Sequence, residues 1–396
     1  MKKLSLYIHI PFCCSKCKYC DFVSFVCPEK MEGFVDALIK EIEIYSERAK
    51  GYKIKTIYIG GGTPSVLPCG FISKVMDAVR TNFALDEDCE ISIEINPNSI
   101  AEDKLMEYRM CGINRISIGA QSMNDKLLKL VGRAHTTQQF KQALELTQKY
   151  FDNINVDMMI GLPGQTKKDI GDMLDYLFSK NMGHISMYSL ILEEGTSLFE
   201  MVKAGSVKLP SENFVVSQYD FGVSRIVKNG FLRYEVSNFS KPGLECRHNL
   251  RYWNMGEYLG FGPSAHSFFE GVRFYNTSNL DEYLESLTEI SKRALCHSKV
   301  KYNEMIKSFL HKLPIISSEK LTARQRKEET LMLGLRTSRG IDISKFNKEF
   351  ACDLLKEKEE ITNRLLKQNL VEIKDGRLAL SDNALYIMDS IVLKLI

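Results

Sequence analysis

The 396-residue chain has no excess of charge of either sign and no long apolar run. It carries 53 Lys and Arg against 50 Asp and Glu, a formal net charge of +3. A balance this even gives no electrostatic reason to expect nucleic-acid or membrane binding. No stretch approaches the ~20 apolar residues that a membrane helix needs, so we expect no stable membrane anchor. With 44% hydrophobic residues, the composition excludes global disorder and allows a packed core.

The N-terminal residues lack the pattern of a secretory signal. The apolar stretch after Lys3 contains His9 and Pro11, and no small-residue cleavage site follows it. The chain has 11 cysteines, an odd number, and shows no export signal. We therefore expect a cytoplasmic protein in which clustered cysteines bind a metal or take part in catalysis rather than pair as disulfides.

Four cysteines lie together, and the other seven are scattered. Cys13, Cys17 and Cys20 have the spacing C-x3-C-x2-C, whereas starting from Cys14 gives C-x2-C-x2-C. A structural zinc site usually takes four ligands from two separated pairs, and no such second pair exists here. Three nearby thiolates suit a cubane iron–sulfur cluster whose fourth iron stays open to an outside ligand. A zinc-binding interaction module is a more distant alternative.

Short strands alternate with helical patterns along most of the chain. The expected strands are Leu4–Ile10, Thr56–Ile59, Glu90–Ile95, Arg115–Ile118, Asn155–Ile160 and His184–Leu190, with helices such as Met31–Ala49 and Thr137–Tyr150 between them. This alternation indicates βαβ units and a parallel sheet, as either a partial barrel or a doubly wound open sheet. Each unusual motif follows a strand, which is where functional groups gather in parallel barrels.

The cysteine spacing, followed by the glycine run of Gly60–Ser65, resembles the signature of the radical S-adenosylmethionine (SAM) superfamily. The resemblance implies an α/β fold built as a partial (β/α)6 TIM-like barrel, with a [4Fe-4S] cluster on Cys13, Cys17 and Cys20. In that superfamily the amino and carboxylate groups of SAM bind the fourth iron, and an electron from the cluster cleaves the cofactor. An electron donor is therefore an implied partner.

The same resemblance implies which other residues contact SAM. These are Tyr7 and Tyr19 beside the cluster, Gly61, Gly62 and Thr63 in the glycine run, and Glu94 at the end of the third strand. Gln121, Arg133 and Asp157 match cofactor-site positions of porphyrinogen-oxidising relatives, in which a second SAM binds. Their presence does not establish a second SAM molecule, and Arg133 is equally well explained as an ordinary polar loop residue.

A second unusual stretch holds the single tryptophan of the chain, Trp253. The string from His248 through Tyr252 to Trp253 resembles the H-N-x-x-Y-W haem-binding motif of the HemW family of haem chaperones. The resemblance implies haem near His248, with an imidazole as the axial ligand and aromatic rings against the porphyrin. Arg247 and Arg251 are candidates to pair with the haem propionates. A single histidine such as His266 is more often structural or exposed than functional.

One position separates two related families. Oxygen-independent coproporphyrinogen III oxidases (HemN) resemble this chain through the first three cysteines, but they have a further cysteine where this chain has Phe22. We therefore expect a haem carrier that passes haem to an acceptor protein the sequence does not identify. The alternative is radical decarboxylation of coproporphyrinogen III, and a different radical enzyme is a third reading. Whether the protein is an enzyme stays open.

The C-terminal part predicts a separate unit. We expect a barrel with the haem-motif extension over residues 1–278, a linker over 279–320, and a third segment over 321–396. The resemblance to the HemW and HemN families implies that this third segment is a small winged-helix-like domain. A hairpin is expected at Leu370–Leu380, around Asp375 and Gly376. Asp353–Gln368 carries four acidic and four basic residues, so it lacks the charge of a DNA-reading helix. A lid over the barrel or a docking surface for a partner protein is expected instead of a nucleic-acid partner.

Overall fold

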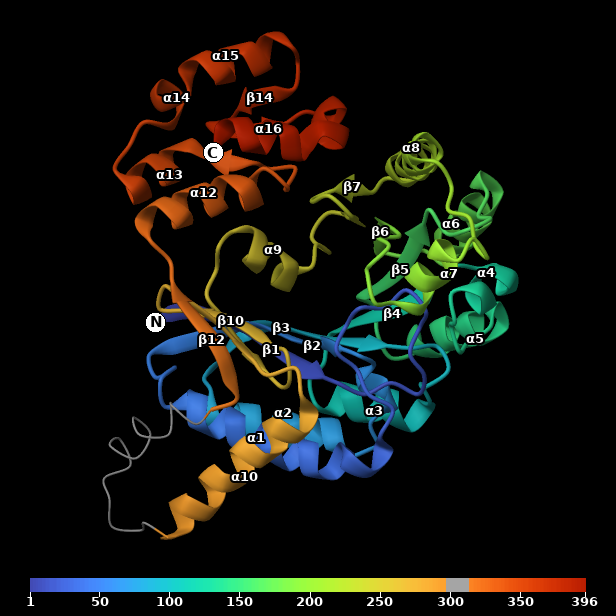
Figure 1. The fold of residues 1–396 in the computed structure, drawn as a ribbon, viewed down its shortest axis with the longest axis vertical. Helices are drawn as coiled ribbons and strands as arrows, with labels where there is room; N and C mark the ends of the chain where they lie inside the picture. Colours follow the sequence, from blue (N-terminus) through green and yellow to red (C-terminus); the bar gives the residue numbers. More distant parts are fainter. Residues whose placement is uncertain (297–312) are drawn as a thin grey trace.

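The computed structural model describes residues 1–296 and 313–396 (Figure 1). In these residues twelve strands form one sheet, in the order β12-β11-β10-β9-β1-β2-β3-β4-β5-β6-β8-β7. Strands β1 to β6 are neighbours in chain order, and each pairs parallel with the next. A doubly wound sheet reverses its strand order, whereas an unbroken order is that of a barrel. The predicted α/β fold with a partial (β/α)6 barrel is therefore confirmed.

The first five barrel strands contain the predicted segments and are longer, whereas β6 ends one residue before the predicted Leu190. They are β1 (Lys2–Ile10), β2 (Tyr52–Gly61), β3 (Leu85–Ile95), β4 (Arg115–Gln121), β5 (Ile154–Ile160) and β6 (His184–Ser189). Strands β2 and β3 begin earlier than expected because their charged first halves pair with each other. Lys53 Nζ, for example, lies 3.6 Å from Asp86 Oδ2. Because these paired residues are charged, the first halves of the two strands lack the apolar alternation that indicates a strand in sequence.

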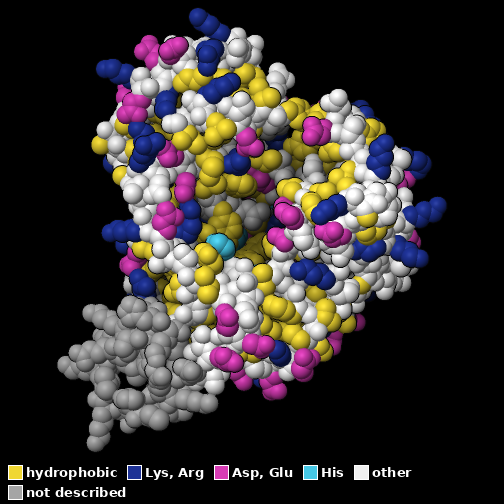
Figure 2. Space-filling view, viewed as in Figure 1, with side chains coloured by type: hydrophobic (Ala, Val, Ile, Leu, Met, Phe, Trp, Pro, Cys, Tyr) yellow, Lys and Arg dark blue, Asp and Glu magenta, His cyan; other side chains and the backbone are white. Residues whose placement is uncertain are grey.

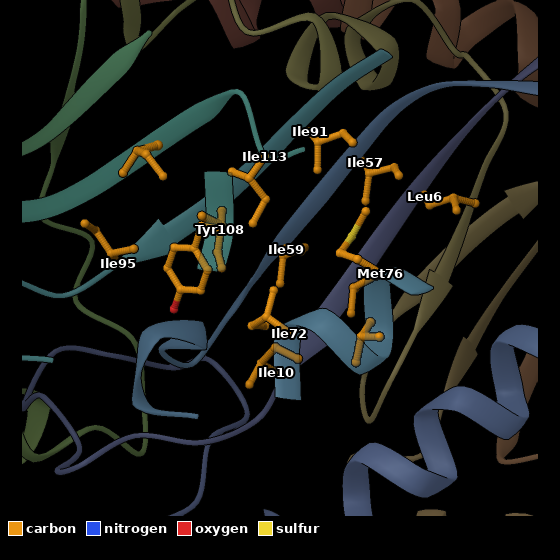
Figure 3. Packing of buried hydrophobic residues seen from close by; sticks show 14 of the residues in the cluster. Leu6, Ile10, Ile57, Ile59, Ile72, Met76, Ile91, Ile95, Tyr108 and Ile113 are labelled. Atoms are coloured by element: carbon orange, nitrogen blue, oxygen red, sulfur yellow. The ribbon is translucent and has the colours of Figure 1, made fainter. Parts of the chain in front are cut away.

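Helices follow the barrel strands along the chain, and all but α4 and α7 contribute to the apolar layer on the outer face of the sheet. They are α1 (Met31–Ser46), α2 (Phe71–Asn82), α3 (Glu102–Met110), α4 (Asp125–Leu130), α5 (Thr137–Thr147), α6 (Lys167–Ser179), α7 (Ser197–Lys203) and α8 (Glu212–Lys228). Figure 3 shows Ile72 and Met76 of α2 packed against Ile57 and Ile59 of β2, in the buried apolar cluster that fills this layer. This apolar core holds the strands in a fixed arrangement. The loops that follow the strand ends, including the cysteine loop, are therefore held in fixed positions.

Further strands extend the sheet on both sides of the barrel. At one edge lie β9 (Tyr258–Phe261), β10 (His266–Phe269), β11 (Val272–Asn276) and β12 (Ile315–Lys320), and at the other lie β7 (Leu232–Arg233) and β8 (Asn238–Ser240). Strand β9 pairs parallel with β1, and β10 to β12 continue antiparallel. A short helix, α9 (Arg247–Trp253), lies between the barrel and the C-terminal elements (Figure 1).

Residues 279–320, which we expected to form a linker, contain regular structure. Helix α10 (Leu280–Cys296) contacts α1, and β12 pairs with β11 in the large sheet. Residues 297–312 of the same segment lie outside the described residues. The domain boundaries at 278 and 320 stay predictions.

The C-terminal elements have their own sheet and their own apolar core. They are α12 (Ala323–Gly334), β13 (Ile341–Asp342), α13 (Ile343–Phe350), α14 (Leu354–Glu357), α15 (Glu359–Lys367), β14 (Val371–Lys374), β15 (Arg377–Leu380) and α16 (Met388–Leu395). The predicted hairpin is β14–β15, and Asp375 and Gly376 have φ of 50° and 72°, as a tight two-residue turn requires. In the described ranges, no helix combines the length and the apolarity needed to cross a membrane.

Candidate functional site

A cavity of about 1210 Å³ opens at the carboxyl ends of the barrel strands and extends to α9 and α12. The face in Figure 2 is hollowed between the barrel and the C-terminal elements, with hydrophobic side chains and a histidine at the hollow. Small-molecule sites usually occupy about 300–1,000 Å³, so this cavity has room for more than one ligand. Most of the predicted site residues line it, the exceptions being Arg247, His248 and Arg251: Tyr7, Cys13, Cys17, Tyr19, Cys20, Gly61, Gly62, Thr63, Glu94, Gln121, Arg133, Asp157, Tyr252 and Trp253.

The cysteine loop follows β1, and Cys13, Cys17 and Cys20 are half-buried in it, whereas Cys14 is exposed and does not line the cavity. This placement agrees with the C-x3-C-x2-C register. In the described part of the chain, no three His, Cys, Asp or Glu side chains converge as ligands of a single ion. A four-iron cluster binds each thiolate at a different iron, so it requires three thiols around one space rather than at one point.

The glycine run packs against the cysteine loop too closely for a side chain. A Cβ on Gly62 would lie 2.7 Å from Phe12 O and 3.1 Å from Cys13 Sγ. Gly61 has a φ of +111°, and a Cβ there would lie 2.8 Å from the ring of His9. A cofactor bound to a cluster on Cys13 would meet backbone here, which fits the predicted role of these glycines.

Arg133 lines the same cavity and is linked to the glycine run through Asn96. Its guanidinium donates to the side chain of Asn96 and to Gly119 O, and it lies 3.6 Å from Cys17 Sγ. Asn96 in turn donates to Thr63 Oγ1 at 3.1 Å. The buried Arg133 Nε has no hydrogen-bond partner among the described residues. A positive charge with a spare donor fits thiolates and an anionic ligand group, such as the carboxylate of SAM.

Glu94 and Asp157 place two carboxyl groups in the cavity, away from bulk solvent. Tyr58 donates to Glu94 Oε1 at 2.8 Å, and Asn155 donates to Asp157 Oδ1 at 2.7 Å. Desolvation, and then the charge of Asp157, raise the pKa of Glu94 to about 7. Desolvation also raises the pKa of Asp157. With a pKa near 7, Glu94 can donate a hydrogen bond when protonated and accept one when ionised, which suits the hydroxyl and amino groups of a nucleoside ligand.

Helix α9 starts on a buried carboxylate of β3. Glu90 accepts the backbone N–H groups of Arg247 and His248, each at 3.0 Å. The first N–H groups of a helix have no partner within the helix, so this carboxylate anchors the start of α9 and favours its dipole. The anchor sets the rotation of α9, which directs Tyr252 and Trp253 to the cavity.

The same rotation buries His248, which differs from the expectation for an axial ligand. Only 1% of the residue is exposed, and both ring nitrogens have hydrogen-bond partners. Nδ1 lies 2.8 Å from Thr56 Oγ1, and Nε2 lies 2.8 Å from Tyr252 OH. Thr56 donates its own hydroxyl proton to Ser5, so the His248 tautomer with Nδ1–H satisfies all these contacts. Tyr252 therefore lies between this imidazole and the cavity.

The two candidate propionate partners also lie elsewhere. Arg247 Nη2 lies 3.3 Å from Asp88 Oδ2, and Arg251 donates to Ser5 Oγ and Lys3 O. Neither arginine lines the cavity. They were expected there because they lie within or beside the motif in sequence, but the helix turns Arg247 toward β3 and Arg251 toward β1.

Several cavity residues were not predicted. Tyr58 and Asn96 have no distinguishing pattern of their own, although Asn96 lies only two residues after the predicted Glu94. Tyr188, at the end of β6, donates to Gln121 Oε1 at 2.6 Å. Arg115 begins β4 and is 2% exposed. Arg115 could have been singled out from the sequence, because a charged residue is unusual in an otherwise apolar parallel strand.

The comparisons with known proteins agree with this geometry. The radical SAM superfamily profile matches residues 7–177, and the HemN C-terminal domain profile matches residues 321–387. The haem chaperone HemW of Lactococcus lactis is 32% identical over 96% of this chain and 94% of that protein. HemW of Bacillus subtilis is 32% identical over 88% of each chain.

A solved structure gives the same fold. The coproporphyrinogen III oxidase HemN from Escherichia coli, described as a radical SAM enzyme, covers 100% of this chain and 90% of its own, with a TM-score of 0.82 at 23% identity. This likeness concerns the fold alone. The radical SAM profile implies a [4Fe-4S] cluster and SAM, and the residues around the cavity fit both. Since relatives of this name match along nearly their whole length, the chain belongs to the HemW family of haem chaperones, within the radical SAM superfamily.

Proposed function

We propose that this chain binds haem in the cavity beside α9 and transfers it to an acceptor protein. The observation that carries the proposal is that one cavity joins the three cysteines of the β1 loop to Tyr252 and Trp253 of α9. A haem held there would lie close to the cluster and to SAM. The relatives named haem chaperones support the same function for this chain.

Cys13, Cys17 and Cys20 would hold the cluster, and the residues around them would hold SAM. The cluster and SAM, when bound, supply one-electron chemistry. Arg133 offers its guanidinium to an anionic group, and the glycine run offers backbone at close range. Glu94 and Asp157 offer carboxyl groups to hydroxyl or amino groups. An electron donor and a haem acceptor would complete the system as partners.

The aromatic side of the cavity suits a porphyrin. Tyr252 contacts Tyr258 edge to face, with ring centroids 4.6 Å apart, and both residues line the cavity together with Trp253 and Phe268. Large flat side chains bury much apolar area and prefer stacked or edge-to-face contacts, which a porphyrin plane also offers. Phe22 stands where HemN proteins have a further cysteine, lines the cavity and is 65% exposed, so no thiol competes there.

A titration tests the proposal. Anaerobically reconstituted protein is titrated with haemin, and the Soret band is followed to saturation. We expect one-to-one binding, followed by loss of the band when apomyoglobin is added in excess as an acceptor. Absence of saturable binding would overturn the proposal, and turnover of coproporphyrinogen III by the same sample would replace it with the oxidase reading.

A further inference from the structure

Four of the histidines in the described residues are poorly placed to bind an iron. His9, His135, His184 and His248 are all buried, and each uses at least one ring nitrogen in a hydrogen bond. For His248 an approach to iron would require breaking the 2.8 Å contact with Tyr252 and moving that side chain aside. An axial ligand needs a ring nitrogen with a free lone pair that reaches the haem.

His266, the first residue of β10, has the opposite placement. It is exposed, and it lines the cavity. Its ring stacks on Tyr275 of β11, with centroids 4.9 Å apart and an interplanar angle of 22°. Within the described ranges, neither of its ring nitrogens has a hydrogen bond. Partial desolvation of the ring, and then the nearby Arg273, lower the pKa of His266, which favours the neutral, ligating form.

The β10–β11 hairpin presents a set of side chains to the cavity in register. His266 pairs with Tyr275, and Phe268 pairs with Arg273. Because side chains alternate along a strand, these four lie on one face of the hairpin, and all except Tyr275 line the cavity. The imidazole of His266 can ligate the iron, and the ring of Phe268 can pack on the porphyrin plane. The guanidinium of Arg273 can pair with a propionate.

The backbone around His266 is held in place. A Cβ on Gly260 of β9 would lie 2.1 Å from His266 O, so the two strands meet closely there. Gly260 N–H also donates to Ser267 Oγ at 2.9 Å. The stacked Tyr275 orients the ring, and the close strands fix its backbone, so His266 is presented to the cavity by a rigid element.

We propose that His266, rather than His248, is the axial ligand of the haem iron, and that Arg273 pairs with a haem propionate. This inference rests on the proposed function, because it assumes that haem binds in this cavity. His248 is then a positioning residue, which holds Tyr252 of α9 against the porphyrin site through its Nε2 contact.

The test uses haemin titrations of the cluster-reconstituted protein, with wild type, His266→Ala and His248→Gln compared. The spectra report the spin state and axial ligation of the iron, and iron analysis with circular dichroism confirms the cluster and the fold. We expect His266→Ala to lose the histidine-ligated spectrum and to weaken haemin binding about tenfold or more. Added free imidazole should restore the spectrum in this variant. His248→Gln should keep the histidine-ligated spectrum, and its effect should fall on haemin affinity, through the altered contact with Tyr252.

The outcomes separate the two proposals. If wild type fails to bind haemin, the proposed function fails. If wild type binds and His266→Ala keeps the histidine-ligated spectrum, the assignment of His266 is overturned while haem binding stands. Loss of that spectrum in His248→Gln alone would return the ligand role to His248.

Discussion

At the residue scale, the site depends on positions where an added methyl group has no space. Gly62 is the clearest, because its Cβ position is 2.7 Å from Phe12 O and 3.1 Å from Cys13 Sγ. The first of these contacts is with backbone, which cannot rotate away as a side chain does. The cysteine loop must therefore shift if Gly62 is replaced.

Gly62→Ala is expected to lower the iron and sulfide content after anaerobic reconstitution, because it displaces the loop that holds Cys13. Overpacking of this kind typically costs about 1–3 kcal/mol, so the protein should still fold. Gly33→Ala is the matched control, since Gly33 is in α1 and a Cβ there would meet nothing within 4 Å. Equal iron content in the two variants would contradict the prediction.

Glu41 predicts a pH dependence of stability. It is fully buried in α1 and accepts hydrogen bonds from Gly262 N–H at 2.8 Å, Asn276 at 2.6 Å and Tyr283 at 2.7 Å. Burial outweighs these bonds and raises its pKa from 4.5 to about 7. The folded state therefore holds a proton that the unfolded state releases between these two pH values.

The stabilisation from this proton is complete below pH 4.5 and is lost as the pH rises through about 7. A shift of this size corresponds to about 3 kcal/mol. We expect Glu41→Gln to reduce the difference in melting temperature between pH 5 and pH 8. Glu43→Gln, on the exposed side of the same helix, should leave that difference unchanged. An unaltered difference in Glu41→Gln would refute the assignment.

At the element scale, the orientation of α9 depends on one carboxylate in another strand. Glu90→Ala removes the acceptor of the Arg247 and His248 N–H groups and leaves buried donors unpaired. Such a loss typically costs about 1–3 kcal/mol. Because Trp253 is the single tryptophan and ends α9, its fluorescence reports this helix directly.

We expect red-shifted emission and stronger acrylamide quenching of Trp253 in Glu90→Ala. Glu87→Ala is the control, because Glu87 is an exposed residue of the same strand. If the two variants give the same emission as wild type, Glu90 does not anchor α9.

The elements themselves were largely predictable from sequence, and their contacts were not. The predicted part of each barrel strand is apolar and rich in β-branched residues, and the cysteine and glycine motifs fall at strand ends, so local pattern was sufficient to find the strands but not their charged first halves. The burial of His248 depends on Thr56 and Glu90, which lie more than 150 residues away in the chain. Local spacing shows that His248 and Tyr252 share a helix face but does not show which face meets the cavity.

The hairpin that presents His266 was missed for a related reason. His266 and Arg273 lie on different strands and are brought to one face of the hairpin only by the pairing of β10 with β11. In the sequence they do not form a recognisable motif. A lone histidine carries little information until its partners are known.

At the scale of the whole molecule, the C-terminal elements close one side of the cavity. Glu329 and Leu333 of α12 line it together with the barrel residues. Other contacts join the two parts, including the Arg233–Asp382 ion pair at 2.7 Å and the bridge between Glu235 and Thr337. These contacts place α12 beside the cavity, and the two roles expected for the C-terminal part, a lid or a docking surface, stay predictions.

The ion pair between Arg273 and Glu329, at 2.5 Å, connects α12 to the hairpin that we propose contacts haem. Glu329 neutralises the guanidinium, and its carboxylate would repel a propionate that approached Arg273. Glu329→Gln removes the competing charge, so haemin affinity should rise about threefold, the size typical of a partly exposed pair. The gain should shrink at high salt, because screening weakens both the pair and the new contact.

Glu328→Gln provides the control, since Glu328 pairs with Arg324 on the outer surface, 2.7 Å away, and does not line the cavity. It should leave haemin affinity unchanged. Arg273→Ala in the Glu329→Gln background should abolish the gain, because no guanidinium then remains for the propionate. If Glu329→Gln weakens haemin binding instead, the pair serves to hold the lid in its binding position. The barrel and the C-terminal unit would then act on haem as one body rather than compete for Arg273.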